Sequence, residues 1–238
     1  MERDYFDNIY YTASLVDYIA RITNNKYCDV VGTLGEDRFR RLVDLADVYL
    51  CCSFEQVSYE IIERHGIMQG QSKTPSLHSK PTYLEIGKAY ALLVSQEGNE
   101  PAQYWQLLYT YLSMPLQLDL KPDTEEAGYV ASLVGAPGCL SCGTDVNTAV
   151  ANVYDALTAW MDAALTYKGY RGSVAFSVED SLFYGKVLDT KALISYEGSN
   201  INYLIADFHN AVDDYLMMCR DDGIVQDDAS KVTEKGIE

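Results

Sequence analysis

Apolar residues recur every three or four positions through much of residues 8–67, which is the spacing of helices that bury one face. The apolar positions of the first such stretch are Ile9, Ala13, Val16, Ile19 and Ala20. Asp17 and Arg21 fall between them, so we expect both side chains to face solvent on a helix that ends near Thr23.

Further helices are predicted by their end signals. Ser53 is a typical N-cap residue before an apolar run, and Gly66 is suited to the left-handed conformation that closes a helix. Residues 68–81 are rich in Gly, Ser and Pro and lack periodicity, which predicts a linker. Two more helical stretches follow it, at about 82–96 and 101–113.

The pattern changes near residue 114, where apolar and polar positions begin to alternate as in half-buried strands. Leu116, Leu118 and Leu120 begin this alternation. Three short strands and then one helix are predicted, and the same order of elements is predicted again after residue 168. Thr144 or Asp145 is expected to cap the first of these helices, and Ser199 or Asn200 the second.

These two segments are internal repeats. Residues 128–163 align with 183–218 at an offset of 55 positions without a gap, which places Tyr129 on Tyr184 and Gly143 on Gly198. The shared residues are mainly strand, corner and helix-core positions, and no constellation of polar residues is common to both copies. The repeat therefore indicates a common scaffold and not a duplicated active site.

The expected fold class is α+β, with a helical N-terminal region followed by two tandem βββα domains. The predicted divisions are a helical domain at 1–67, a linker and helical pair at 68–113, repeat domains at 114–167 and 168–222, and an acidic tail at 223–238.

The first repeat carries a specific set of motifs: Gly128-Tyr129 on a strand, the turn Pro137-Gly138-Cys139, and Gly143-Thr144 before an alanine-rich helix. This set resembles the HicB antitoxin family. The second repeat resembles the same family through Phe183-Tyr184-Gly185 and Ile194-Ser195-Tyr196. The N-terminal half loosely resembles an uncharacterised bacterial helical domain, which implies no function.

The HicB resemblance implies a partial ribonuclease-H-like fold and a non-enzymatic role as an antitoxin or antitoxin-derived regulator. Members of the family neutralise HicA, a small basic toxin that cleaves mRNA, and many also bind DNA through a further domain. The segment after Cys219 is short and acidic, unlike such a domain.

The charge of the chain predicts either a basic protein partner or an acidic surface that only keeps the protein soluble. The net charge is −17, and residues 110–238 carry 8 Lys or Arg against 20 Asp or Glu, a balance of −12. Such a surface attracts cationic proteins and repels nucleic acid. The acids at or near the predicted hairpins are the expected partner-binding residues: Asp119, Asp123, Glu125, Glu126, Glu179 and Asp180.

A second hypothesis is a transcriptional regulator that contacts DNA through its N-terminal helices. Arg38, Arg40 and Arg41 form the clearest basic cluster of the sequence and are the candidate nucleic-acid contacts. The competing interpretation is a solvated helix face on which these arginines pair with Glu36, Asp37 and Asp44.

Catalytic and metal chemistry find little support, so we expect no enzyme and no cofactor. A nuclease would need carboxylates converging on divalent metals, and the acids lie at turns instead. Cys139 and Cys142 have CxxC spacing but no second pair for zinc, while Cys51 and Cys52 are interpreted as core residues. Without a signal peptide or an apolar run long enough for a membrane span, a cytoplasmic protein is expected, and oligomers remain possible.

Overall fold

The structure is a computed structural model that describes residues 2–221 except positions 73, 79, 99, 137, 178 and 181. The predicted tail at 223–238 lies outside the described residues. The α+β class is confirmed by helices and small antiparallel sheets. The chain divides into two compact units, one made by the described residues of 1–134 and 138–154, the other by those of 135–137 and 155–238.

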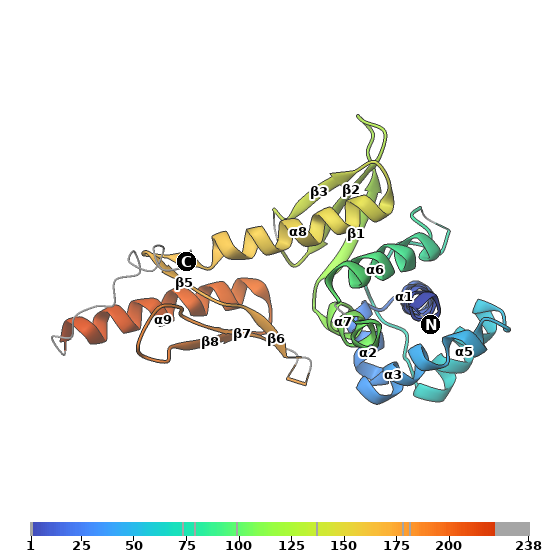
Figure 1. The fold of residues 1–238 in the computed structure, drawn as a ribbon, viewed down its shortest axis with the longest axis horizontal. Helices are drawn as coiled ribbons and strands as arrows, with labels where there is room; N and C mark the ends of the chain where they lie inside the picture. Colours follow the sequence, from blue (N-terminus) through green and yellow to red (C-terminus); the bar gives the residue numbers. More distant parts are fainter. Residues whose placement is uncertain are drawn as a thin grey trace. The chain divides into compact units, whose positions relative to one another are not determined.

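The first unit begins with helices that pack around α1 (Figure 1). Their bounds are α1 Glu2–Thr23, α2 Tyr27–Leu34, α3 Glu36–Asp44, α4 Ala46–Tyr49, α5 Phe54–His65, α6 Tyr83–Glu97, the 3-10 turn η1 Pro101–Gln103 and α7 Tyr104–Ser113. Two predicted end signals of α5 are confirmed. The Ser53 hydroxyl accepts the Gln56 N–H, and Gly66 adopts φ 65° after the last turn.

The prediction that Asp17 and Arg21 face solvent is wrong, because both are buried with exposed fractions of 2% and 5%. Arg21 Nε lies 2.5 Å from Asp17 Oδ2, and the Tyr27 hydroxyl donates to Asp17 Oδ1 at 2.6 Å. The guanidinium also donates to the carbonyl oxygens of Ser76 and Pro81. These partners make burial of the two charges tolerable.

The predicted linker lies along the end of α1 and is held there by its backbone. Gly70 N–H donates to the Thr23 carbonyl at 2.7 Å, and Ser72 N–H donates to the Asn24 carbonyl at 2.8 Å. The Asn25 side chain donates to the Met68 carbonyl. Helix α6, which follows this segment, packs directly against α1.

The first unit ends in a three-stranded antiparallel sheet and the start of a long helix. The strands are β1 Gln117–Pro122, β2 Tyr129–Val134 and β3 Leu140–Gly143, in the order β1-β2-β3, and the helix is α8 Val146–Ala164. Of the two predicted caps, Asp145 is the one whose carboxylate accepts the Thr148 N–H. Leu118, Leu120, Ala131 and Leu133 are buried, as the alternation predicts.

The second unit contains a hairpin that the sequence did not predict, then a second three-stranded sheet and a helix. The elements are β4 Thr166–Tyr167, β5 Tyr170–Arg171, β6 Ala175–Ser177, β7 Leu182–Lys186, β8 Ser195–Gly198 and α9 Ile201–Asp221. The sheet order is β6-β7-β8, and α9 packs mainly on β8 (Figure 1). Asn200 caps α9 by accepting the Tyr203 N–H.

The gap-free alignment of the repeats is wrong for their hairpins. Gly143 and Gly198 do correspond, because a Cβ atom on either would lie 2.3 Å from a helix N atom six residues later. However, Tyr129 pairs with Gly143 and Phe183 pairs with Gly198, so Tyr129 corresponds to Phe183 and the offset is 54. The extra residue falls between β7 and β8. Successive side chains of a strand point to opposite faces of the sheet, so a shift of one residue changes the face. Tyr184 therefore lies on the open face of its sheet, whereas Tyr129 lies on the helix-facing side of its own.

None of the described helices combines the length and apolar character that crossing a membrane requires.

Candidate functional site

The two faces of the sheet β6-β7-β8 differ in character. Phe183 and Tyr196 point toward α9 and are buried, and the Tyr196 ring lies 5.1 Å from the Phe208 ring of that helix. The opposite face carries Tyr184 and Glu197, which are cross-strand partners and exposed. Helix α9 therefore covers one face and leaves the other available for contacts.

Tyr196 fixes the position of β8 within this sheet. Its hydroxyl donates to the Ser173 carbonyl at 2.6 Å, and burial raises the pKa of Tyr196 well above its usual value. The ring occupies space left by Gly172 and Gly185, where an added Cβ would overlap Tyr196. The neutral, anchored tyrosine thereby determines where the next residue, Glu197, emerges on the open face.

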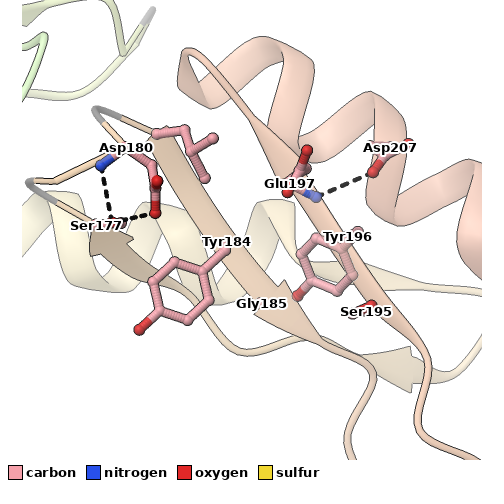
Figure 2. A pocket seen from close by; sticks show the side chains of 9 residues that line it. Ser177, Asp180, Tyr184, Gly185, Ser195, Tyr196, Glu197 and Asp207 are labelled. Atoms are coloured by element: carbon pink, nitrogen blue, oxygen red, sulfur yellow. Dashed lines mark hydrogen bonds between the residues drawn. The ribbon is translucent and has the colours of Figure 1, made fainter.

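Two further carboxylates are oriented by hydrogen bonds (Figure 2). Asp207, on α9, accepts the Glu197 backbone N–H at 3.0 Å. Asp180, in the turn after β6, accepts the Ser177 hydroxyl at 2.8 Å, and Ser177 Oγ accepts the Asp180 N–H in return. Each carboxylate keeps acceptor capacity, since an ionised carboxylate offers about four lone-pair sites.

These groups line one open pocket of about 600 Å³. Its lining residues are Ser177, Asp180, Leu182, Tyr184, Gly185, Ser195, Tyr196, Glu197 and Asp207. None of these lining residues is basic, so the pocket has a negative potential. The exposed Tyr184 ring adds a surface on which a cation can rest. The arrangement suits a lysine ammonium or an arginine guanidinium.

A metal ion is a poorer match for this pocket. Within the described part of the chain, no group of three or more His, Cys, Asp or Glu side chains is arranged to hold a metal. Divalent cations require several oxygen ligands at short, converging distances. An organic cation with several N–H donors places fewer demands on the geometry.

The predicted acidic residues are divided between the two units. Asp119 pairs with Lys121 at 2.7 Å, and the Asp123 carboxylate accepts the N–H groups of Glu125 and Glu126, which lowers the pKa of Asp123. All of these belong to the first unit. The other two predicted residues, Glu179 and Asp180, belong to the second unit, and of the six only Asp180 lines the pocket.

Glu197 and Asp207 were missed, although the repeat contains a signal for them. In the first sheet, the Asn152 amide donates to the Cys142 carbonyl at 2.9 Å, and these residues lie 55 positions before Asp207 and Glu197. The two copies thus share the position of a polar contact but neither its residue types nor its direction. Both copies use a helix side chain to cap an outward backbone group of the edge strand, and only the second uses a carboxylate.

The predicted arginine cluster is also divided. Arg40 extends over the Trp105 ring and lies 3.9 Å from Asp44, while Arg38 and Arg41 line a different pocket beside α5. Arg40 therefore does not share a surface with the other two.

The cysteines show no common site. Cys51 and Cys52 are exposed, so their interpretation as core residues is wrong, because they lie in the turn after α4. Cys139 is buried with its Sγ near the Val153 carbonyl, whereas Cys142 is exposed, so the CxxC pair is split between inside and outside.

Comparison with known proteins adds no further assignment. No family model matches the chain, and no curated protein or solved structure matches it significantly. The second unit itself offers an acidic pocket that extends from the open face of the sheet to Asp207 of α9.

Proposed function

We propose that the chain is a non-enzymatic binding protein related to HicB antitoxins, and that its second unit binds a small basic protein of the HicA type. The observation that carries the proposal is the pocket that Asp180, Glu197 and Asp207 line together with Tyr184, whose ring is exposed. The occupant is a lysine or arginine side chain of the partner.

Electrostatics supports this choice of partner. A net charge of −17 steers a basic protein toward the chain from a distance and increases its rate of association. Long-range attraction alone does not select a surface. The pocket would determine which surface the partner contacts. A guanidinium inside it would make charge-assisted hydrogen bonds to oriented carboxylates and pack on an aromatic ring.

Neutralising the pocket should weaken the complex without disturbing the fold. We expect Asp207→Asn combined with Glu197→Gln to raise the dissociation constant for a HicA-type toxin by about tenfold or more, since hydrogen bonds to charged groups are worth roughly 1.5–3 kcal/mol each. Asparagine retains an oxygen that can accept the Glu197 N–H, so the cap of β8 is preserved. Isothermal titration calorimetry at physiological salt measures the change.

The matched control removes the same charge from the first unit. Glu125→Gln combined with Asp119→Asn takes two negative charges from the first sheet, one from β1 and one from the turn after it, outside the pocket. We expect this control to alter affinity less than about threefold, through screened long-range attraction only. Equal losses in both double variants would show that overall charge, and not the pocket, is recognised. No measurable binding of basic proteins to the unaltered chain would refute the function itself.

A further inference from the structure

The first unit gathers positive charge in one place although the chain as a whole is strongly acidic. Arg38 and Arg41 from α3 and Arg64 and His65 from the end of α5 line a pocket of about 430 Å³. The remaining lining residues are Leu42, Leu45 and Tyr49. None of these is a carboxylate, which is unusual in a protein of net charge −17.

The local structure explains how these side chains converge. Arg38 and Arg41 are three positions apart on α3 and therefore project from the same side of the helix. Gly66 ends α5 in the left-handed conformation, which leaves Arg64 and His65 in its last turn. Arg64 pairs with Glu60, but no ion pair of Arg38 or Arg41 is found among the described residues. Two arginines thus hold unneutralised charge at the pocket.

His65 is affected by this concentration of cations. Partial burial, Arg38 and Arg64 together lower the pKa of His65 below its usual value. The charged and titratable groups that line the pocket with His65 are Arg38 and Arg41 from α3, Tyr49 from α4 and Arg64 from α5. Arg64 also pairs with Glu60. Gathering cations in this way carries an electrostatic cost that a bound anion would relieve.

We infer that this pocket binds the phosphate group of a small organic phosphate. Arg38 and Arg41 would contact the phosphate oxygens, for which the planar guanidinium is suited, and Leu45 and Tyr49 would contact the organic part. This site is independent of the acidic pocket, because all of its residues belong to the first unit.

A small ligand matches the pocket better than a nucleic-acid backbone does. Its volume lies in the range of about 300–1,000 Å³ that is typical of small-molecule sites. A backbone would require a row of cations along a surface, yet Arg40 turns away toward Trp105 and Asp44. The high negative charge of the chain also opposes a polyanion more strongly than it opposes a single phosphate.

The test compares two arginines of the same helix in the full-length protein. Adenosine monophosphate is titrated by calorimetry into the unaltered chain, Arg41→Gln and Arg40→Gln. We expect Arg41→Gln to weaken binding by about tenfold or more, and Arg40→Gln to change it less than about twofold because Arg40 lies outside the pocket. A parallel titration with inorganic phosphate should show weaker binding with the same dependence on Arg41.

A second measurement reports on the site without relying on affinity. The His65 imidazole, assigned by comparison with His65→Gln, is titrated by NMR with and without sulfate, which stays divalent across the range. A bound anion favours the imidazolium form, so sulfate should raise the pKa of His65 more than chloride at equal ionic strength does.

Three results would overturn the inference. The first is equal weakening by Arg40→Gln and Arg41→Gln, which would mean unspecific attraction. The second is an unchanged His65 titration in sulfate. The third is tighter binding of a single-stranded oligonucleotide than of adenosine monophosphate, with a dependence on all three arginines of α3, which would indicate a nucleic-acid surface.

Discussion

Replacing Arg21 by Met should lower the free energy of unfolding by about 3–5 kcal/mol, because it leaves the Asp17 carboxylate buried without its charged partner. Asp17 is 2% exposed and would retain only the Tyr27 hydroxyl as a described neighbour donating to it. The same change also leaves the Ser76 and Pro81 carbonyls without the guanidinium. Urea denaturation followed by circular dichroism measures the loss.

Arg64→Met is the matched control, since Arg64 pairs with Glu60 at the same spacing of four residues on a helix. Those side chains are 60% and 50% exposed, and exposed pairs contribute roughly 0.2–1 kcal/mol. If Arg21→Met and Arg64→Met lowered the free energy of unfolding by similar amounts, burial would not be what makes the Arg21–Asp17 pair important.

The loss in Arg21→Met should also depend on pH. Burial raises the pKa of Asp17, and Arg21 acts against that effect in the unaltered chain. Without Arg21 the folded-state pKa lies further above the unfolded value of about 3.9, so the folded state binds a proton that the unfolded state releases. The difference in stability from the unaltered protein should be smallest below that value and grow as the pH rises through the folded-state pKa.

The second large effect concerns the glycines that end the two edge strands. Gly198→Ala should cost about 3 kcal/mol or more, because its Cβ would lie 2.3 Å from the Leu204 backbone nitrogen and the helix would have to shift. Gly143→Ala should have a comparable cost, since its Cβ would lie 2.3 Å from the Ala149 nitrogen. Differential scanning calorimetry on the full-length chain measures both.

Gly32→Ala provides the opposite expectation for the same substitution. Gly32 lies within α2, and a Cβ added there would have no described neighbour within 4 Å beyond its own helix backbone and adjacent residues. Alanine there should stabilise the protein by up to about 1 kcal/mol through helix propensity. A neutral result at Gly198 or Gly143 would mean that the helices approach their sheets less closely than described.

Local signals in the sequence were sufficient for most of the elements. The caps at Ser53 and Asp145 and the glycine at 66 act within a few residues, so they can be recognised without tertiary information. Asp17 and Arg21 could not be placed correctly, because the groups that satisfy Arg21 come from residues 55 and 60 positions away. The β4–β5 hairpin has two residues in each strand, too few for a periodic pattern.

The candidate site was harder to predict because it depends on strand register. Asp180 could be predicted, because it lies in the turn between two strands that the sequence indicates. Glu197 and Asp207 meet only because β8 and α9 are adjacent, and a gap-free alignment placed Tyr184 on the wrong face. The alignment offset of 55 and the offset of 54 given by strand pairing differ by one additional residue between β7 and β8. Hydrophobic periodicity does not reveal that residue.

The cap that Asp207 places on β8 has a consequence for assembly. An unpaired edge strand usually offers its amides to a strand from another molecule, which is a common route to fibres and swapped dimers. Here an incoming strand would first have to displace a carboxylate from the Glu197 N–H. The second sheet should therefore resist growth at its β8 edge.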